Sequence, residues 1–506
     1  MQIRLAEILK SGLFCLLMSG LLLSCNSGEK MAQGDGMSWK NKLKVADRFF
    51  EQGYYYDAAN YYEDVITLQP DNVDVMYKLG DSYFYGRDYK TAQTYYKQVV
   101  DNNVQLYPIA HYRYALTLKM NGKFDEAKTE FKSFIKGYRA YDAPVYKKMV
   151  KNEIAGCDFA KEALNNPLNV MVVHIGNEIN AGYTEASPLP VDDDRLMFSS
   201  LRSDTLLVTD NIKEKTGRFR LYESTITKQP GRVTIDEGSE GQKKWGNGEP
   251  LPKEINAPGK DVANGTFSPD GKKFYFTQCE PDKTGKMICA IYVSDYENEK
   301  YSNVKVLPET INIPGYTSTH PTLAEYKKGS HLLYFVSNMP DGVGGLDIWY
   351  SEITKSGEIK PPRNAGKKVN TVGDELTPFY NNNSKILYFS SNGHPSMGGY
   401  DVFTTVGRQR KWTKPENVGF PLNSVVDDMY FVADGDEEGG YFVSNRKGTI
   451  ALKSETCCDD IFRYNWDRDY IPKFAVQGFA YNADDSTKTS FKDYDVKLYQ
   501  IERDST

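Results

Sequence analysis

Aspartates that recur beside glycine pairs are the first residues in this sequence that could do chemistry. Gly344-Gly345 precede Asp347, Gly398-Gly399 precede Asp401, and the acidic pair Asp459-Asp460 follows at a similar step. Clustered carboxylates could bind a divalent metal ion. One acid in each repeat would instead be spread around a ring, where it accepts backbone N–H groups at a tight turn. We expect this structural role and no metal site.

Catalytic motifs are the second kind of chemistry to consider. His394 and Ser396 lie close together in Gly393-His394-Pro395-Ser396, in an expected loop between strands, but no acid of clear role accompanies them. We find no G-x-S-x-G elbow and no Walker, Rossmann or H-E-x-x-H pattern. The sequence therefore predicts a protein that is not an enzyme and that needs no cofactor.

Cysteine supplies a further set of reactive groups. Cys279 and Cys289 flank a short polar segment and could close a strand-loop-strand hairpin in an oxidising compartment. Cys457 and Cys458 are adjacent, and their pairing stays open. Zinc binding would need more cysteine or histidine at short spacing, and the five histidines are scattered.

The N-terminus carries one cysteine of special interest. An apolar run from Leu13 to Leu23, too short for a secure membrane span, ends in Leu22-Leu23-Ser24-Cys25. This tetrapeptide resembles a bacterial lipobox, which implies a signal peptide at 1–24, lipid on the Cys25 sulfur and a tether at 25–37. The alternative is an ordinary signal peptide that contains a cysteine. Asn26 after the cysteine favours the outer membrane, on its periplasmic side.

Length and charge constrain the part of the chain beyond the tether. The chain has 506 residues, with 62 basic and 68 acidic side chains and a net charge of −6. This length exceeds one hydrophobic core and indicates several domains. The charge gives no basis for binding nucleic acid, which requires a basic patch.

Helical repeats of about 34 residues fill the N-terminal third. Two columns of small residues recur at steps of 34 and 35 residues: Ala46, Gly80 and Ala115, and Ala58, Ala92 and Ala127. Small residues are needed where two helices cross closely. Leu79-Gly80-Asp81-Ser82-Tyr83 nearly completes the tetratricopeptide pattern. We therefore predict a tetratricopeptide repeat (TPR) domain at 38–165, with a capping helix near its end.

The aromatic tips of these repeats are candidate contacts for a partner protein. Tyr is favoured in contact surfaces, and stacked helical repeats offer a broad one. The candidates are Tyr54, Tyr56, Tyr85 and Arg87. Each could instead pack on the next helix.

Strand repeats of about 55 residues occupy 168–472. Five aromatic strands recur (196–198, 274–276, 334–335, 388–389 and 441–442), as do five Asn markers: Asn180, Asn256, Asn312, Asn370 and Asn423. Tandem sheets left flat would expose their edges, so we expect a closed, five-bladed β-propeller. Residues 169–175 have no blade of their own and should supply the outer strand of the last one. Phe267-Ser268-Pro269-Asp270-Gly271-Lys272 resembles the turn of WD40-like propellers.

The pattern changes again after residue 474. Two expected strands at 476–481 and 494–499 resemble the start of a carboxypeptidase-regulatory-like β-sandwich. Such a domain needs more residues than the 33 present here, so we expect a partial domain at 474–506 and a fragment of a longer protein.

The order of these segments carries a family resemblance. Lipobox, TPR repeats, WD40-like propeller and regulatory-like strands resemble the periplasmic outer-membrane lipoproteins of the Bacteroidota type IX secretion and gliding machinery. An OmpA-like domain usually follows in that family and is missing here, so peptidoglycan binding is carried onto no residue. The resemblance implies a lipid-anchored scaffold that contacts proteins of the secretion or gliding complex. The alternative is a glycan- or ligand-binding propeller module at the cell envelope.

Overall fold

Helices come first and strands second in the part of the chain that the structure describes. The computed structural model describes residues 37–202, 207–209, 212–214, 218–226, 244–283, 285–435, 437–451 and 453–466. All of them belong to one compact unit, Met1–Trp466. The expected signal peptide, Cys25 and the partial β-domain at 474–506 lie outside the described residues. No helix among the described residues is long and apolar enough to cross a membrane.

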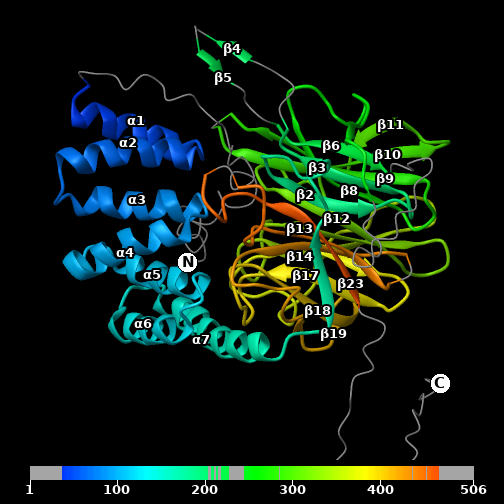
Figure 1. Cartoon of the computed structure of the whole chain (residues 1–506). Helices are drawn as coiled ribbons and strands as arrows, with labels where there is room; N and C mark the ends of the chain where they lie inside the picture. Colours follow the sequence, from blue (N-terminus) through cyan, green and yellow to red (C-terminus); the bar gives the residue numbers. More distant parts are fainter. Residues whose placement is uncertain are drawn as a thin grey trace, which may run out of the picture. The chain divides into compact units, whose positions relative to one another are not determined.

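Seven helices form three antiparallel hairpins and a capping helix (Figure 1), as the repeat pattern predicts. The side chains of the small columns are fully buried where helices cross, and a Cβ on Gly80 would lie 2.7 Å from the Tyr96 ring. Ser38, Asn72 and Asp88 cap three of the helices by accepting a backbone N–H. The helices are α1 (Trp39–Glu51), α2 (Tyr55–Leu68), α3 (Val73–Tyr85), α4 (Tyr89–Asn103), α5 (Pro108–Met120), α6 (Phe124–Gly137) and α7 (Ala143–Asn165).

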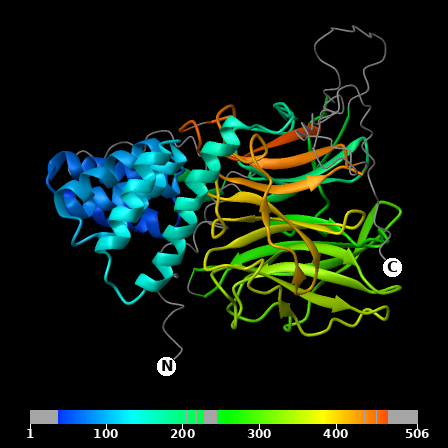
Figure 2. The ribbon, with the colours of Figure 1, turned by 90° about the horizontal axis from the view of Figure 1, so that it is seen from below.

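Five antiparallel sheets of four or five strands follow and form a five-bladed propeller (Figures 1 and 2), which confirms the predicted fold class. The first blade contains β2 (Glu185–Pro190), β3 (Arg195–Ser200), β6 (Arg220–Thr225) and β7 (Glu249–Pro250). The second contains β8 (Asp261–Phe267), β9 (Lys273–Pro281), β10 (Met287–Glu297) and β11 (Lys300–Val306). The third contains β12 (Ser318–Glu325), β13 (His331–Ser337), β14 (Asp347–Ile353) and β15 (Arg363–Asn364).

The fourth blade contains β16 (Glu375–Asn381), β17 (Ile386–Ser391), β18 (Asp401–Arg408), β19 (Lys411–Trp412) and β20 (Glu416–Asn417). The fifth contains β21 (Asp428–Ala433), β22 (Gly439–Ser444) and β23 (Asp460–Trp466). A separate two-stranded ribbon, β4 (Leu207–Thr209) and β5 (Ile212–Glu214), lies in the connection between β3 and β6. The five aromatic strands of the sequence are β3, β9, β13, β17 and β22.

The fifth blade takes its outer strand from the other end of the propeller. Strand β1 (Val170–His174) pairs antiparallel with β23, with Val170 opposite Trp466 and His174 opposite Phe462. This pairing confirms the prediction that residues 169–175 close the ring. Val170 is buried against Phe431, Phe442 and Tyr464, so the closure also extends the core of the blade.

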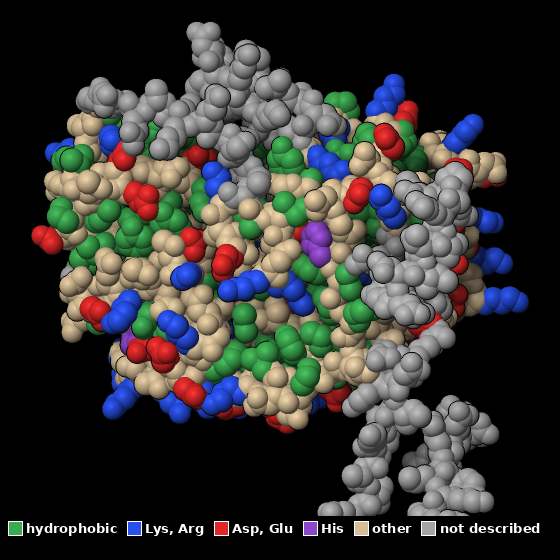
Figure 3. All heavy atoms as spheres, viewed as in Figure 1, with side chains coloured by type: hydrophobic (Ala, Val, Ile, Leu, Met, Phe, Trp, Pro, Cys, Tyr) green, Lys and Arg blue, Asp and Glu red, His purple; other side chains and the backbone are tan. Residues whose placement is uncertain are grey.

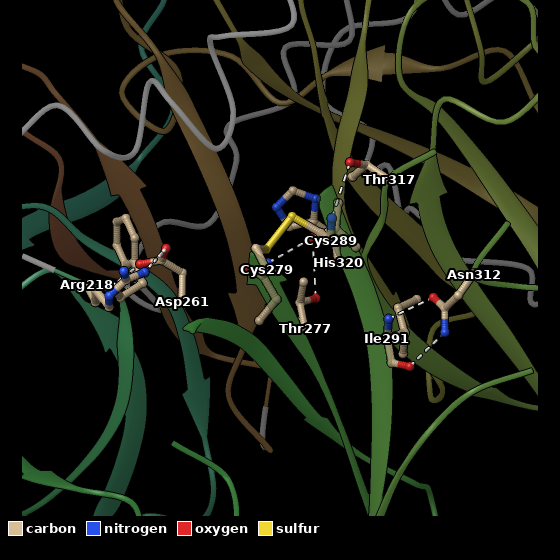
Figure 4. Close-up of a disulfide and its surroundings, with 12 residues drawn as sticks. Arg218, Asp261, Thr277, Cys279, Cys289, Ile291, Asn312, Thr317 and His320 are labelled. Atoms are coloured by element: carbon tan, nitrogen blue, oxygen red, sulfur yellow. Dashed lines mark hydrogen bonds and ion pairs between the residues drawn. A yellow bond between two sulfur atoms is a disulfide. The ribbon is translucent and has the colours of Figure 1, made fainter. Parts of the chain in front are cut away.

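The five Asn markers perform one repeated task. Each side-chain amide bonds both the N–H and the C=O of one residue on the third strand of the blade before it. Asn312 accepts from the Ile291 amide at 2.9 Å and donates to the Ile291 carbonyl at 3.0 Å (Figure 4). Asn180, Asn256, Asn370 and Asn423 do the same for Ile461, Leu221, Ile348 and Val402. The marker therefore satisfies buried backbone groups where the chain passes to the next blade.

Replacing one marker should leave two buried backbone groups unpaired. In Asn370→Ala the amide and carbonyl of Ile348 lose their partners, and each such group costs about 1–3 kcal/mol. We expect the free energy of unfolding, measured by urea denaturation, to fall by about 2–5 kcal/mol. Asn383→Ala removes an exposed side chain from the same blade and serves as the control. Equal midpoints for the two variants would contradict this role.

Candidate functional site

The helical repeats and the propeller meet in a buried contact, which we call the helix–propeller junction. It consists of the turns and helix ends of α2–α5, one face of α7, and the propeller loops 393–399, 425–427 and 454–459. The turns after α1, α3 and α5 belong to this side, because helix and return helix run antiparallel. The right-hand ends of α1–α3 point toward the propeller in Figure 1.

Arg87 is the charged centre of the junction. It occupies the turn after α3 in a left-handed conformation (φ 61°) and is only 2% exposed. Its guanidinium forms ion pairs with Asp459 and, at 3.8 Å, with Asp427. Tyr89 donates to Asp427 at 3.2 Å, and Thr456 donates to the Arg87 carbonyl. Removing one partner from such a buried cluster leaves an uncompensated charge, so the cluster fixes which surfaces meet.

A second buried ion pair holds the fourth blade against α5 and α7. Lys119 is 1% exposed, pairs with Glu153, and donates to the Ser396 hydroxyl at 3.1 Å. Asn152 donates to the Gly393 carbonyl at 2.6 Å. Loop 393–399 therefore lies directly on the helices.

Close packing completes this second contact. A Cβ on Gly156 would lie 2.2 Å from the carbonyl oxygen of Ser396, so only glycine allows this approach. Met397 is fully buried in the same hydrophobic cluster as Phe131 and Cys157 of the helices. Hydrophobic packing and charge thus act at the same place.

The adjacent cysteines lie at the third contact of the junction. Cys457 and Cys458 form a disulfide, and Tyr56 packs against them. The Tyr56 hydroxyl donates to Ser454 at 3.0 Å. The pairing that the sequence left open is therefore within the dipeptide, and its neighbour is a helical residue. Cys279 and Cys289 form the hairpin disulfide that their positions allow (Figure 4), whereas Cys157 is a free, buried thiol.

The four residues predicted to contact a partner occupy different environments. The Arg87 side chain is buried in the junction, and Tyr56 contacts the propeller. Tyr85 is 3% exposed, stacks on Tyr55 at 5.3 Å, and accepts from Arg113 at 2.9 Å. Tyr54 is half-buried with its ring against Phe49. Arg87 and Tyr85 therefore offer no surface to a second protein in this conformation, and their role in partner binding stays a prediction.

Several residues of the junction were not predicted from the sequence. Lys119 is the one charged residue in the largely apolar stretch of α5 from Ala115 to Met120, and this could have marked it in the sequence. Nothing local marks Glu153 or Ser396 as its partners, since they are 34 and 277 residues away in sequence.

The recurring aspartates are structural, as the sequence analysis expected. Asp401 accepts the N–H groups of Met397 at 2.6 Å and Gly398 at 3.1 Å, and Asp347 accepts those of Val343 and Gly344. Asp460 accepts the Ile450 N–H in the next blade. No group of three possible metal ligands gathers among the residues described.

A second set of acidic residues was not predicted from the sequence. Each is the first residue of an innermost strand and lies five residues after the marker Asn. Glu185, Glu375 and Asp428 each accept the N–H of the residue four positions earlier, at 3.1, 2.7 and 2.6 Å. Burial raises the pKa of Glu185 and of Glu375 to about 8. Such values suit a general acid, but each carboxyl is bonded within its own blade. Within the described ranges we see no acids converging on one open site.

His394 and Ser396 do not form a catalytic pair. His394 Nε2 lies 2.8 Å from the Val369 carbonyl, so the imidazole is held by backbone. Ser396 is buried and bonded to Lys119 in the junction. The pair therefore has a packing role.

A family comparison agrees with the helical part of the architecture. The tetratricopeptide repeat family matches residues 77–140. No curated protein matches the sequence. Among solved structures, the first TPR domain of Spaghetti bound to an HSP90 peptide is 19% identical, covers 25% of this chain and 94% of its own length, and gives a TM-score of 0.21.

Enzymes are also among the similar structures. The endo-arabinase from Bacteroides thetaiotaomicron is 15% identical over 58% of this chain and 98% of its own, with a TM-score of 0.36. The α-L-arabinofuranosidase from Lactobacillus brevis is 14% identical over 60% and 98%, with a TM-score of 0.34. Likeness at this level says nothing about activity.

Adding one methyl group at Gly156 should weaken the contact between the helices and the propeller. Gly156→Ala places a Cβ against the Ser396 carbonyl, and relieving such overpacking costs about 1–3 kcal/mol. We expect faster hydrogen exchange in loop 393–399 and α7, together with lower stability. Gly137→Ala is the matched control, because a Cβ at this helical glycine meets nothing within 4 Å. Identical exchange in both variants would show that the close approach is dispensable.

Glu375 should make stability depend on pH. Its pKa of about 8 exceeds the ordinary 4.5 because of burial, so the folded state retains a proton that the unfolded state releases. Stability should therefore fall as pH rises from about 4.5 to 8, by on the order of 5 kcal/mol at most. Glu375→Gln should remove this component, since the hydroxyls of Thr371 and Ser391 can accept from the new amide.

The measurement is a series of urea midpoints between pH 5 and 9 for wild type and variant. Glu416→Gln alters an exposed carboxyl in the same blade and is the control. A Glu375→Gln curve parallel to wild type would show that the carboxyl is ionised throughout this range.

Proposed function

We propose that this protein is a non-catalytic scaffold of the type IX secretion or gliding machinery, held at the periplasmic face of the outer membrane by lipid on Cys25. The order of lipobox, helical repeats, propeller and regulatory-like strands supports this proposal. Membrane flotation of Cys25→Ala tests the anchor: the variant should become soluble, and continued flotation with outer membrane would disprove lipid attachment there.

The arrangement of the helical repeats carries the scaffold proposal. The turns after α1, α3 and α5 lie on the junction side, where Arg87 in the turn after α3 is buried, so the turns at the other ends of the helices face away from the propeller. At these opposite turns three successive hairpins carry exposed apolar side chains: Leu68, Leu106 and Tyr141, which are 54%, 70% and 66% exposed. We call these three residues the outer edge. Hydrophobic side chains also gather over the helices in Figure 3.

A scaffold needs such a surface, and an enzyme would not. A contiguous exposed apolar patch commonly marks a protein contact, and we propose that the three residues of the outer edge belong to one. Because the junction already joins the helices to the propeller, a partner on the outer edge would be held in a fixed place relative to the propeller. The scaffold would then act by positioning proteins.

Polar substitutions on the outer edge should abolish partner capture without unfolding the protein. Leu68→Ser, Leu106→Ser and Tyr141→Ser together alter only exposed positions, so we expect stability changes within about 0.5 kcal/mol for each. The measurement is quantitative recovery of cross-linked envelope proteins with the full chain from its native cells.

The control removes comparable apolar surface from the propeller. Val306→Ser on β11 and Val406→Ser on β18 alter side chains that are 50% and 49% exposed. Loss of the same captured proteins only in the control would place the partner on the propeller. Unchanged recovery from the outer-edge variant would disprove the proposed contact.

A further inference from the structure

The axis of the propeller has a feature that the scaffold does not use. The innermost strand of every blade contains a register shift, and at each shift one residue adopts a left-handed backbone with φ between 47° and 58°. These residues are Ser187, Asn264, His320, Thr377 and Tyr430. None is glycine, although side chains make this conformation unfavourable. Each of the five blades therefore has one residue in an unfavourable backbone conformation, at the register shift of its innermost strand.

The strained residues surround one hollow, which we call the axial cavity. It has a volume of about 80 Å³, and all five of them line it. Its lining residues include no Asp, Glu, Lys or Arg. Hydroxyls and proline and aromatic rings make up much of the rest.

Hydrogen bonds between blades hold this lining in place. The Asn264 amide group donates to Thr319 at 3.1 Å, and Thr319 donates to Thr277 at 3.3 Å. His320 Nε2 and the Tyr430 hydroxyl are 3.0 Å apart. Figure 4 shows the His320 ring beside the Cys279–Cys289 disulfide and Thr277. The cavity walls are thus fixed by neighbouring side chains.

Two polar atoms of the lining have no partner. The Oδ1 of Asn264 and the Nδ1 of His320 are buried and make no hydrogen bond within the described protein. Both residues are only 4% exposed. Burial lowers the pKa of His320 to about 3, so the imidazole is neutral at physiological pH. The Asn264 oxygen therefore lacks a hydrogen-bond donor, and Nδ1 of the neutral His320 ring lacks a hydrogen-bond partner.

We infer that the axial cavity binds the hydroxyl groups of a small neutral polyol or sugar. A hydroxyl donates and accepts, so it satisfies the Asn264 oxygen and either tautomer of His320. An ion would lose its hydration and meet no opposite charge there. The cavity is small, so it admits a polyol or one arm of a sugar. This inference is independent of the scaffold function, because it concerns the axis and not the outer edge.

The test follows the His320 ring in the full chain during titration with glycerol. The sequence contains five histidines, so long-range ¹H–¹⁵N spectra of the rings are simple, and His320→Asn identifies the relevant signal. Asparagine tolerates the left-handed backbone. We expect a saturable shift of the His320 nitrogens. D-glycerate, which carries a carboxylate on a similar skeleton, should bind at least tenfold more weakly.

Two substitutions and an internal reference complete the design. Asn264→Gly suits the backbone and removes the orphan oxygen, so the affinity for glycerol should fall at least tenfold while the thermal midpoint confirms folding. His331, whose Nδ1 is also unpartnered but lies outside the axial cavity, should not shift. A non-saturable shift, an equal response of His331, or unchanged binding in Asn264→Gly would each overturn the inference. So would a crystal soaked in glycerol that shows ordered water alone in the cavity.

Discussion

Pairing of β1 with β23 is the constraint on which the rest of the structure depends. Without β1 the fifth blade would expose a strand edge, and the ring would stay open between its first and last blades. The strand that closes the ring begins at Val170, shortly after α7 ends at Asn165. Closure therefore also fixes the end of the helical domain beside the fifth blade. This placement brings α5 and α7 to loop 393–399, where Lys119, Glu153 and Gly156 form their contacts.

The junction makes the two repeat domains dependent on each other. Met397 is buried among helical side chains, and Asp459 faces Arg87. A chain without residues 38–165 would expose the methionine and leave the carboxylate without its cation. Loss of function after such a deletion would therefore combine a missing contact surface with a damaged propeller. Substitutions on the outer edge avoid this ambiguity, because Leu106 and its counterparts contribute little to the core.

Sequence patterns predicted the features that repeat and missed the single contacts between the helices and the propeller. The small columns, the Asn markers and the acids of the turns recur in register, because each repeat must satisfy the same backbone groups and pack on the next. Arg87 looked like an exposed tip, since a turn in a helical repeat is usually solvated. Its partner Asp459 is 372 residues away, and periodicity carries no information about such a contact. The same limit hid the link between Lys119 and Ser396.

Differences between blades are therefore the best guide to function in a repeat protein of this kind. The marker Asn is identical in all five blades because its task is identical. At the axis the backbone repeats its left-handed turn, yet the side chains are Ser187, Asn264, His320, Thr377 and Tyr430. Glycine would accept this conformation without strain, whereas the Ser187 and Thr377 hydroxyls accept the buried N–H groups of Asn264 and Tyr430. Five different polar side chains stand there, two of them with unpaired atoms, so the axis carries a specific set of hydrogen bonds. The fold supplies the ring, and the residues that break its symmetry supply the specificity.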